Sequence, residues 1–244
     1  PVPSVGLARS DDLHTWHKLS INPVTTIDRI IYTDEPNAAW SRPRWRDPFL
    51  IKEGGKIYQL VTAARKDGCR NTAGTIALAV TTDMLRWEIL PPLSLPHLAE
   101  DLECPKLIRI GARYHLSVSI NEPVIGARLR SRQPQGLPID TTYTLVADSF
   151  LGPYTLHGSG RILQSDTWGQ PYACEPVRFR ERFWLLGTIW RDDGCDYVCD
   201  PIPLEVTELG LRAPGRASCP SNPAPDDRID DDGSGLWIDE VLDL

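Results

Sequence analysis

The chain has 244 residues, of which 41% are hydrophobic, so it is long enough to bury a sizeable core within one domain. Its formal net charge of −7 disfavours nucleic acid as a partner, and no apolar run approaches the roughly 18–20 residues of a membrane-spanning helix. The sequence contains no nucleotide-binding fingerprint and no three-ligand metal cluster, so we expect neither a cofactor nor a metal ion.

The N-terminal segment predicts short strands joined by a turn. Residues 7–16 read as a strand that ends in Ser10-Asp-Asp, and the aromatic Trp16 starts the next strand. Ser and Asp favour such turns because their side chains bond to the backbone a few residues onward. Residues 28–33 predict a further strand, and a loop rich in Asn, Ala, Ser and Pro leads from it to Trp45.

Residues 45–60 predict a hairpin that begins at a charged turn. The motif Arg46-Asp47-Pro48 precedes an apolar strand, and Gly54-Gly55 separates this strand from a second one. Glycine adopts the positive φ of a tight hairpin turn without strain. Such a hairpin is common, and its significance here comes from repetition.

Two further segments repeat the hairpin. Residues 103–117 and 174–187 each place an acidic residue one or two positions before a proline, and then continue with an apolar strand, a polar turn and an aromatic-containing strand. The three prolines, Pro48, Pro105 and Pro176, follow one another at intervals of roughly 60–70 residues. The first twenty residues lack this hairpin half, so they predict only part of a unit.

A second signature alternates with the hairpins. It is a strand that ends in a Ser, Thr or Asp turn, and its closing aromatics are Trp16, Trp87 and Tyr154. Hairpin, strand, turn and strand make a four-stranded unit, and units repeated on this scale are typical of a β-propeller. We therefore predict an all-β propeller with complete units over residues 45–92, 101–162 and 163–212, the second interrupted by a polar connection over 121–140.

The C-terminal part differs in composition. Residues 213–235 are rich in Pro, Asp and Ser and predict a mobile loop, whereas residues 235–244 are compatible with a last strand. We predict a single propeller domain over residues 1–244 whose first and last blades are incomplete. An unclosed sheet exposes edge strands, so we expect a missing segment, the C-terminal strand or a second chain in an oligomer to cover the edge.

The acidic residues beside the prolines are predicted to meet. The innermost strand of each propeller blade runs along the central axis, so the motifs Arg46-Asp47, Glu103-Cys104 and Cys174-Glu175 would converge in one small volume. Crowded carboxylates raise at least one pKa, as general acid catalysis at a glycosidic bond requires. The alternative is that acidic residues at strand starts are solvated caps.

Several segments resemble the five-bladed propellers of glycoside hydrolase families 32, 43 and 68. The motif Trp45-Arg-Asp-Pro48 resembles the Arg-Asp-Pro motif of these furanosidases, and Glu103-Cys-Pro105 resembles the Glu-Cys-Pro motif of family 32, the invertases, levanases and inulinases. The turn at 10–16 is similar to the first-blade turn of family 32, and residues 147–153 are similar to family 43. The segment 166–173 resembles a fourth-blade segment, so the resemblance covers roughly residues 5–210.

This resemblance implies roles for individual residues. Glu103 would be the acid/base, Asp47 would stabilise the oxocarbenium-like transition state, and Arg46 would hold the carboxylates in place. We further expect Asp166 and Glu175 to contact the substrate. Together these residues predict a five-bladed, β-fructofuranosidase-like active site.

Three aromatic residues lie next to the axial motifs: Trp45, Trp168 and Tyr172. Sugar rings present flat C–H faces that pack on such side chains, so we predict that the three residues bind substrate at the rim. The alternative is that their rings fill gaps between blades.

The sequence departs from family 32 at the nucleophile. The family uses an aspartate in a first-blade Trp-x-Asn-Asp-Pro-like segment, and this sequence contains no such segment. Asp11 and Asp12 belong to an outer turn and are not candidates. We expect residues upstream of Pro1 to supply the nucleophile, or the protein to perform different chemistry.

Two functional hypotheses follow. The first is a glycoside hydrolase or transglycosylase that acts on furanosides, fructosyl before arabinosyl. The second is a non-hydrolytic relative, either a sugar-binding module or a biosynthetic enzyme that reuses the axial funnel. Both imply a small carbohydrate or glycoside as the partner, and both leave a cytoplasmic and a secreted location open.

Overall fold

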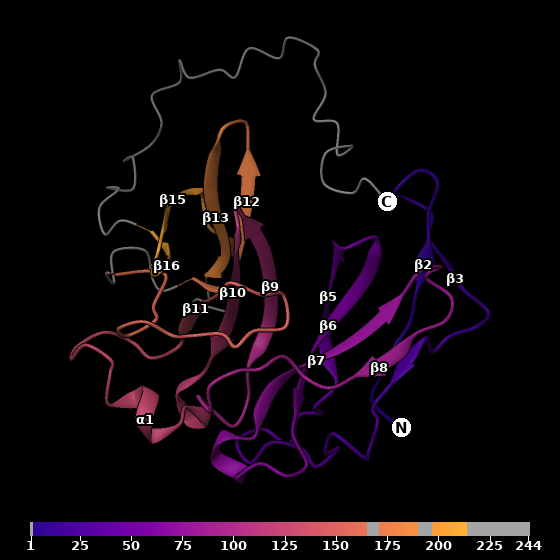
Figure 1. Cartoon of the computed structure of the whole chain (residues 1–244), viewed down its shortest axis with the longest axis horizontal. Helices are drawn as coiled ribbons and strands as arrows, with labels where there is room; N and C mark the ends of the chain where they lie inside the picture. Colours follow the sequence, from indigo (N-terminus) through magenta and orange to yellow (C-terminus); the bar gives the residue numbers. More distant parts are fainter. Residues whose placement is uncertain (1, 165–170, 190–196, 214–244) are drawn as a thin grey trace.

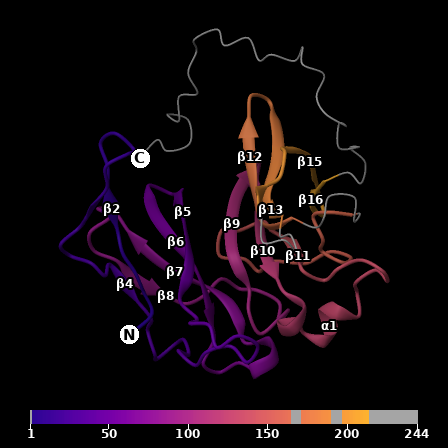
Figure 2. The same cartoon turned by 180° about the vertical axis from the view of Figure 1, so that it is seen from behind.

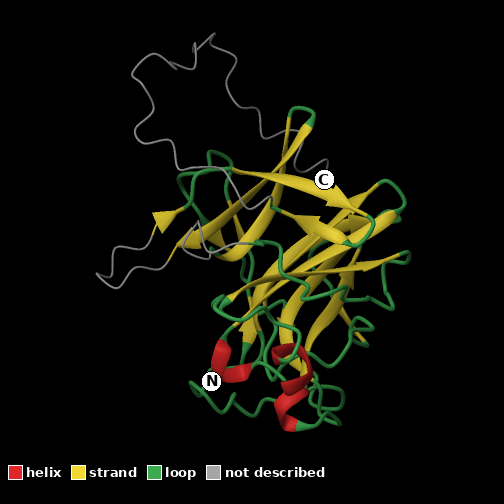
Figure 3. Cartoon of the chain, turned by 90° about the vertical axis from the view of Figure 1, so that its left-hand side faces the viewer, coloured by secondary structure: helices red, strands yellow, loops and turns green. Residues whose placement is uncertain are grey.

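The computed structural model describes residues 2–164, 171–189 and 197–213, which fold mainly as antiparallel β-sheet (Figure 1). The prediction of an all-β protein is confirmed. The predicted loop at 213–235, beyond Ala213, and the predicted strand at 235–244 lie outside the described residues. Helical turns in the described part are few and gather at one end (Figure 3); they are η1 (Arg70–Thr72), η2 (Glu122–Val124) and α1 (Ala127–Arg130).

The first complete unit is a four-stranded antiparallel sheet. Gly54 and Gly55 have φ values of 58° and 77° and form the tight turn between its first two strands, as the Gly-Gly pair predicted. The third strand is buried along its whole length, because neighbouring structure covers both of its faces. The strand order is β5 (Arg46–Glu53), β6 (Lys56–Ala64), β7 (Gly74–Thr81) and β8 (Glu88–Leu90).

Two more sheets follow along the chain and match the predicted units. The second contains β9 (Glu103–Ile110), β10 (Arg113–Ile120) and β11 (Thr141–Ala147), with Thr155 bridging to Val146 at its outer edge. The third contains β12 (Tyr172–Phe179), β13 (Arg182–Ile189), β14 (Tyr197–Val198), β15 (Ile202–Thr207) and β16 (Gly210–Arg212).

The first strands of the three sheets are neighbours. β9 contacts both β5 and β12, and Figures 1 and 2 show β9 between them. The largest core cluster lies between the first two sheets and includes Leu60, Leu78, Leu116 and Leu145. This arrangement brings the starts of β5, β9 and β12 close together.

The N-terminal segment forms two short pairs of strands. β1 (Ser4–Val5) pairs with β4 (Thr25–Thr26), and β2 (Ala8–Arg9) pairs with β3 (His17–Lys18). The predicted strand at 28–33 is wrong, because these residues form a turn. The Asp28 carbonyl accepts the amide hydrogen of Tyr32, and the Tyr32 ring is fully buried in a core cluster. The apolar residues that suggested a strand therefore anchor a turn instead.

The repeated turn signature is confirmed in two of its copies. Asp12 accepts hydrogen bonds from the amides of His14 and Thr15 at 2.8 and 2.7 Å. Asp83 accepts bonds from the amides of Leu85 and Arg86, both at 2.9 Å. The tryptophan that closes each turn donates its indole N–H to a turn carbonyl, at 3.2 Å in the first copy and 2.9 Å in the second. The same side chains thus build the same turn in two units.

Candidate active site

β5, β9 and β12 begin with the same backbone irregularity. Their first residues are Arg46, Glu103 and Tyr172, and each strand then bulges by one residue relative to its neighbour. In each sheet, one cross-strand pair lies before the bulge and one after it. These pairs are Arg46–Thr62 and Phe49–Leu60 in the first sheet, Glu103–Ser119 and Lys106–Ser117 in the second, and Tyr172–Thr188 and Glu175–Leu186 in the third.

The residue inside each bulge has a positive φ. The values are 54° for Asp47, 50° for Cys104 and 52° for Ala173, in a region that non-glycine residues seldom adopt. Such strained positions persist where the surrounding structure holds them and are common at functional sites. The bulges make Arg46, Glu103 and Tyr172 equivalent positions of three blades.

This register corrects the predicted position of Glu175. The residue equivalent to Pro48 and Pro105 is Cys174, so Glu175 corresponds to Phe49 and Lys106 and lies one step farther along the strand. Its half-exposed carboxylate pairs with Lys106 Nζ at 3.0 Å. The sequence comparison aligned Glu175-Pro176 with the acidic residue and proline of the first two motifs. The backbone pairing instead places Tyr172 beside Glu103.

The Glu103 carboxylate is buried and is held by donors from the chain on several sides. Its Oε1 accepts a hydrogen bond from Arg46 Nη2 at 2.6 Å, with Arg42 Nη1 at 3.5 Å. Its Oε2 accepts bonds from the Tyr172 hydroxyl at 2.6 Å and from Asn121 Nδ2 at 3.0 Å. These contacts fix the plane and direction of the carboxylate.

Arg46 joins the carboxylates of the site. Its Nη2 donates to Asp101 Oδ2 at 2.9 Å as well as to Glu103, and its Nε lies 3.5 Å from Asp47 Oδ2. Burial lowers the pKa of Arg46, but Asp101, Glu103 and Asp47 outweigh this effect and raise the pKa above its ordinary value. Arg46 is therefore a permanent cation between three acidic groups.

Asp47 is the more accessible of the two predicted catalytic carboxylates. Its side chain is 26% exposed, whereas that of Glu103 is 5% exposed. Asp47 Oδ2 accepts hydrogen bonds from Thr62 Oγ1 at 3.1 Å and from the Cys104 amide at 3.2 Å. The bond to Cys104 links the bulges of two blades, so the position of Asp47 depends on both sheets.

A buried layer supports Arg46 from behind. Asp101 is fully buried and also accepts a bond from Asn37 Nδ2 at 2.7 Å. Glu100 accepts a bond from buried Arg44 at 2.6 Å. Sequence reasoning missed this layer, although the acidic pair directly before Leu102 and Glu103 was a visible signal. Asn37 and Asn121 carried no such signal, since isolated asparagines are common in loops.

Two further groups near Glu103 stay protonated. Burial, followed by Asp47 and Glu103, raises the pKa of the Cys104 thiol to about 12. Burial, followed by the nearby Glu103 carboxylate, raises the pKa of Tyr172 far above its ordinary value. Cys104 is therefore a neutral thiol at neutral pH and a poor nucleophile, while Tyr172 remains a hydrogen-bond donor.

The structure corrects the role predicted for Trp45. Its side chain is buried in a core cluster, and its ring meets Tyr32 edge-on with centroids 5.5 Å apart. Trp45 therefore fills the interior, as the alternative interpretation proposed, instead of facing a substrate. Tyr172 is also buried, and it presents its hydroxyl to Glu103 and not an open ring face. Asp166 and Trp168 lie outside the described residues.

The site as described offers a buried carboxylate held in a fixed position, a more accessible carboxylate and a cation between them. No group of three or more potential metal ligands occurs among residues 2–164, 171–189 and 197–213. Also within the described part, no helix is long and apolar enough to cross a membrane. The chemistry that the geometry supports is proton transfer together with electrostatic stabilisation of a cationic centre.

A levansucrase from Erwinia amylovora is similar in sequence to this chain. It is 26% identical over an alignment of 181 residues, and the match covers 62% of this chain and 41% of the relative. The chain thus spans less than half the length of this curated relative. No family model matches the sequence.

Solved structures show the same fold. An inulosucrase from Halalkalicoccus jeotgali bound to kestose has a TM-score of 0.63 at 20% identity and covers 91% of this chain and 64% of its own. A sucrose-6-phosphate hydrolase from Lactobacillus gasseri has a TM-score of 0.60 at 14% identity and covers 86% of this chain and 42% of its own. A Bombyx mori family 32 β-fructofuranosidase mutant in complex with sucrose has a TM-score of 0.57 at 16% identity, and the match covers 86% of this chain and 43% of the enzyme. The predicted propeller and the resemblance to the family 32 and 68 superfamily are confirmed.

Proposed function

We propose that this chain carries the acid/base half of a glycosidase-like active site for furanosides, fructosyl before arabinosyl. The observation that carries the proposal is the pair of hydrogen bonds that fix Glu103. Arg46 and Tyr172, from the neighbouring blades, each donate to its carboxylate at 2.6 Å. The sequence relative is a levansucrase, and the solved relatives include enzymes bound to sucrose and kestose. Hydrolysis and transglycosylation use the same groups, so both belong to this proposal.

Glu103 acts as the general acid and base. Cleavage of a glycosidic bond requires protonation of the leaving-group oxygen, and the same residue then removes a proton from the incoming water or sugar hydroxyl. Proton transfer requires a group held within hydrogen-bond reach of one oxygen atom. The donors on both Glu103 oxygens supply this fixed position.

Asp47 acts on the sugar ring. A furanosyl transition state carries positive charge on its ring, and a nearby fixed carboxylate stabilises that charge. Asp47 fits this role because it is partly exposed while its Oδ2 is held by Thr62 and Cys104. Arg46 is a positioning residue that keeps the acidic groups at fixed separations.

The mechanism of retaining glycosidases also needs a nucleophilic carboxylate. Among the described residues, the third carboxylate that contacts Arg46 is Asp101, which is fully buried and bonded to Asn37. Burial makes Asp101 a supporting group and not a nucleophile. Because no nucleophile is found among the described residues, a second function is also supported: a propeller that binds a small sugar in the same funnel without cleaving it.

The test replaces Glu103 by glutamine, which preserves the shape of the side chain and removes its titratable proton. We expect turnover of sucrose or an inulin or levan oligomer to fall about 10²- to 10⁴-fold, the usual contribution of general acid–base catalysis. The loss should be smaller on an activated aryl furanoside, whose leaving group needs less protonation. Glu175→Gln is the matched control, since the register places Glu175 away from Glu103.

Two outcomes decide against the enzyme proposal. Unchanged turnover of a natural furanoside by Glu103→Gln would remove Glu103 from the mechanism. Calorimetric binding of these sugars by a wild-type protein that cleaves none of them would favour the sugar-binding function. An aryl arabinofuranoside that reacts faster than sucrose would reverse the order of preference between fructosyl and arabinosyl substrates.

A further inference from the structure

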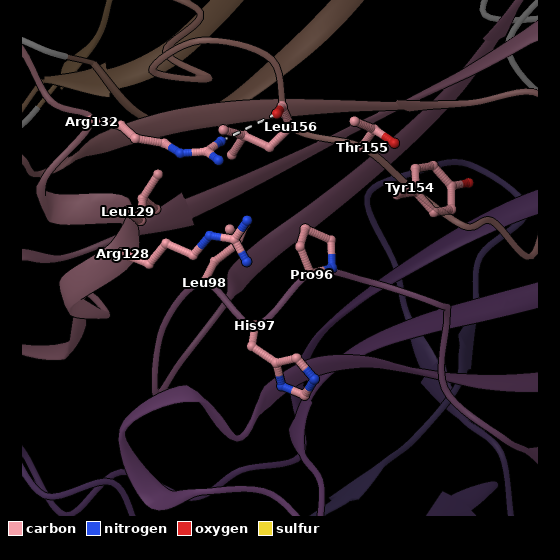
Figure 4. A pocket seen from close by; sticks show the side chains of 9 residues that line it. All are labelled: Pro96, His97, Leu98, Arg128, Leu129, Arg132, Tyr154, Thr155 and Leu156. Atoms are coloured by element: carbon pink, nitrogen blue, oxygen red, sulfur yellow. Dashed lines mark hydrogen bonds between the residues drawn. The ribbon is translucent and has the colours of Figure 1, made fainter.

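A pocket lies beside α1, outside the cluster of Arg46, Asp47 and Glu103. Its volume is about 220 Å³, and its walls come from three segments that are distant in sequence, around Leu98, Leu129 and Leu156 (Figure 4). The volume is several times the roughly 30 Å³ that one water molecule occupies in the liquid. The pocket therefore has room for a small ligand.

Two arginines point into this pocket, one in α1 and one two residues beyond its end. Arg128 and Arg132 are four residues apart, and Figure 4 shows both guanidinium groups directed into the cavity. Arg132 Nη1 donates to the Leu156 carbonyl at 3.5 Å, and no described carboxylate lies within ion-pair distance of either arginine. Like charges at this spacing repel each other unless an anion lies between them.

Arg130, between them in sequence, shows the contrast. Its Nη1 pairs with Glu122 at 2.9 Å, and its Nη2 donates to the Glu122 carbonyl at 2.8 Å. The chain thus neutralises the arginine that does not line the pocket. The uncompensated charge is concentrated on the two arginines that do line it.

His97 lies on the opposite wall, where its ring contacts Arg65. Arg65 Nη2 is 2.7 Å from His97 Nδ1 and 3.5 Å from Nε2. The charged and titratable lining residues are Arg128, Arg132, His97 and Tyr154, and none of the lining residues is a carboxylic acid.

We propose that this pocket binds a phosphate group, either free or carried by a small organic molecule. Arginine is well suited to phosphate because its planar donors match two phosphate oxygens at once. Pro96, Leu98, Leu129 and Leu156 line the rest of the cavity and offer an apolar surface to an organic substituent. The site is separate from the glycosidase function proposed above and does not depend on it.

The test measures binding by calorimetry with inorganic phosphate, glucose 6-phosphate and glucose, at ionic strength matched with sodium chloride. We expect wild type to bind phosphate with a Kd of about 1 mM or tighter. Arg128→Gln and Arg132→Gln should each weaken binding about 10- to 100-fold, the range for one lost hydrogen bond to a charged group. Arg130→Gln is the matched control and should retain wild-type affinity, and the Tm of each variant verifies its fold.

The two phosphate sources are distinguished by comparing the ligands. Tighter binding of glucose 6-phosphate than of phosphate assigns an organic phosphate, while equal binding assigns the inorganic ion. Three results would overturn the site: no binding of either phosphate by wild type, equal binding by the variant that carries both Arg128→Gln and Arg132→Gln, or an equal loss in Arg130→Gln. The last result would mean that diffuse surface charge, and not this pocket, attracts the anion.

Discussion

The hydrogen bond between the Tyr172 hydroxyl and Glu103 was not predicted from the sequence. It donates to Glu103 Oε2 at 2.6 Å and accepts a bond from Asn121 at 2.7 Å. Its raised pKa keeps the proton on the phenol, so the direction of the bond is fixed. Tyr172 therefore orients the Glu103 carboxylate, and its buried ring offers no open face on which a sugar could stack.

Tyr172→Phe removes this donor and keeps the buried ring. Because a hydrogen bond to a charged group is worth about 1.5–3 kcal/mol, we expect kcat to fall about 10-fold or more while KM changes little. Tyr143→Phe is the control, since its hydroxyl donates at 2.9 Å to the Ile139 carbonyl in another buried position. Equal effects of the two variants on kcat would reduce Tyr172 to a structural role.

Trp45 contributes to stability. Its side chain is 3% exposed and packs on Tyr32, and replacing a buried Trp by Ala costs about 3–5 kcal/mol. We expect Trp45→Ala to lower the free energy of unfolding by about that amount, as measured by urea denaturation. If Trp45→Ala leaves the urea midpoint unchanged and raises KM, Trp45 contacts the substrate and does not stabilise the core.

At the scale of single elements, the N-terminal turn has a specific pH dependence. The backbone amides of Thr15 and His14, followed by the hydroxyl of Ser10, lower the pKa of Asp12 to about 2 from its ordinary 3.8. A lowered pKa means that the ionised carboxylate stabilises the folded turn. The contribution is complete above pH 3.8 and is lost as the pH falls through about 2.

We therefore expect an NMR titration of the Asp12 carboxyl to give a midpoint near 2. Asp12→Ala should increase amide hydrogen exchange at Thr15 at pH 5, and the difference from wild type should shrink as the pH falls through about 2 and disappear below it. Asp12→Asn retains an oxygen acceptor, so its exchange rate at Thr15 should lie between those of wild type and Asp12→Ala. A midpoint at 3.8 or above would show that the turn does not hold the carboxylate in solution.

The hairpins and turns were predictable because their determinants are local. Gly54-Gly55 and the aspartate turns specify their conformations within a few residues. The strand at 28–33 was wrong because the burial of Tyr32 depends on residues far away in sequence. The third axial motif was misplaced for a related reason: its bulge is set by pairing with β13, which begins at Arg182, and not by Pro176.

At the scale of the whole molecule, the order and spacing of the three units predicted the arrangement of the sheets. The spacing also predicted that Arg46, Asp47 and Glu103 meet, since each belongs to the start of an innermost strand. The supporting residues Asn37 and Asn121 were not predictable, because loops between blades bring them to the site. A site shared by three sheets forms only when all three are folded and packed.

The measurement that tests the central claim most directly is the steady-state kinetics of Asp47→Asn on sucrose and on an inulin or levan oligomer. The change is nearly isosteric, and the lost stabilisation belongs to the transition state, so it should appear in kcat more than in KM. We expect kcat to fall about 10²-fold or more, the scale of one pre-organised electrostatic partner, while Glu175→Gln stays near wild type. If Asp47→Asn retains wild-type kcat and changes only sugar affinity, the carboxylate binds ground-state sugar and the site is not a glycosidase active site.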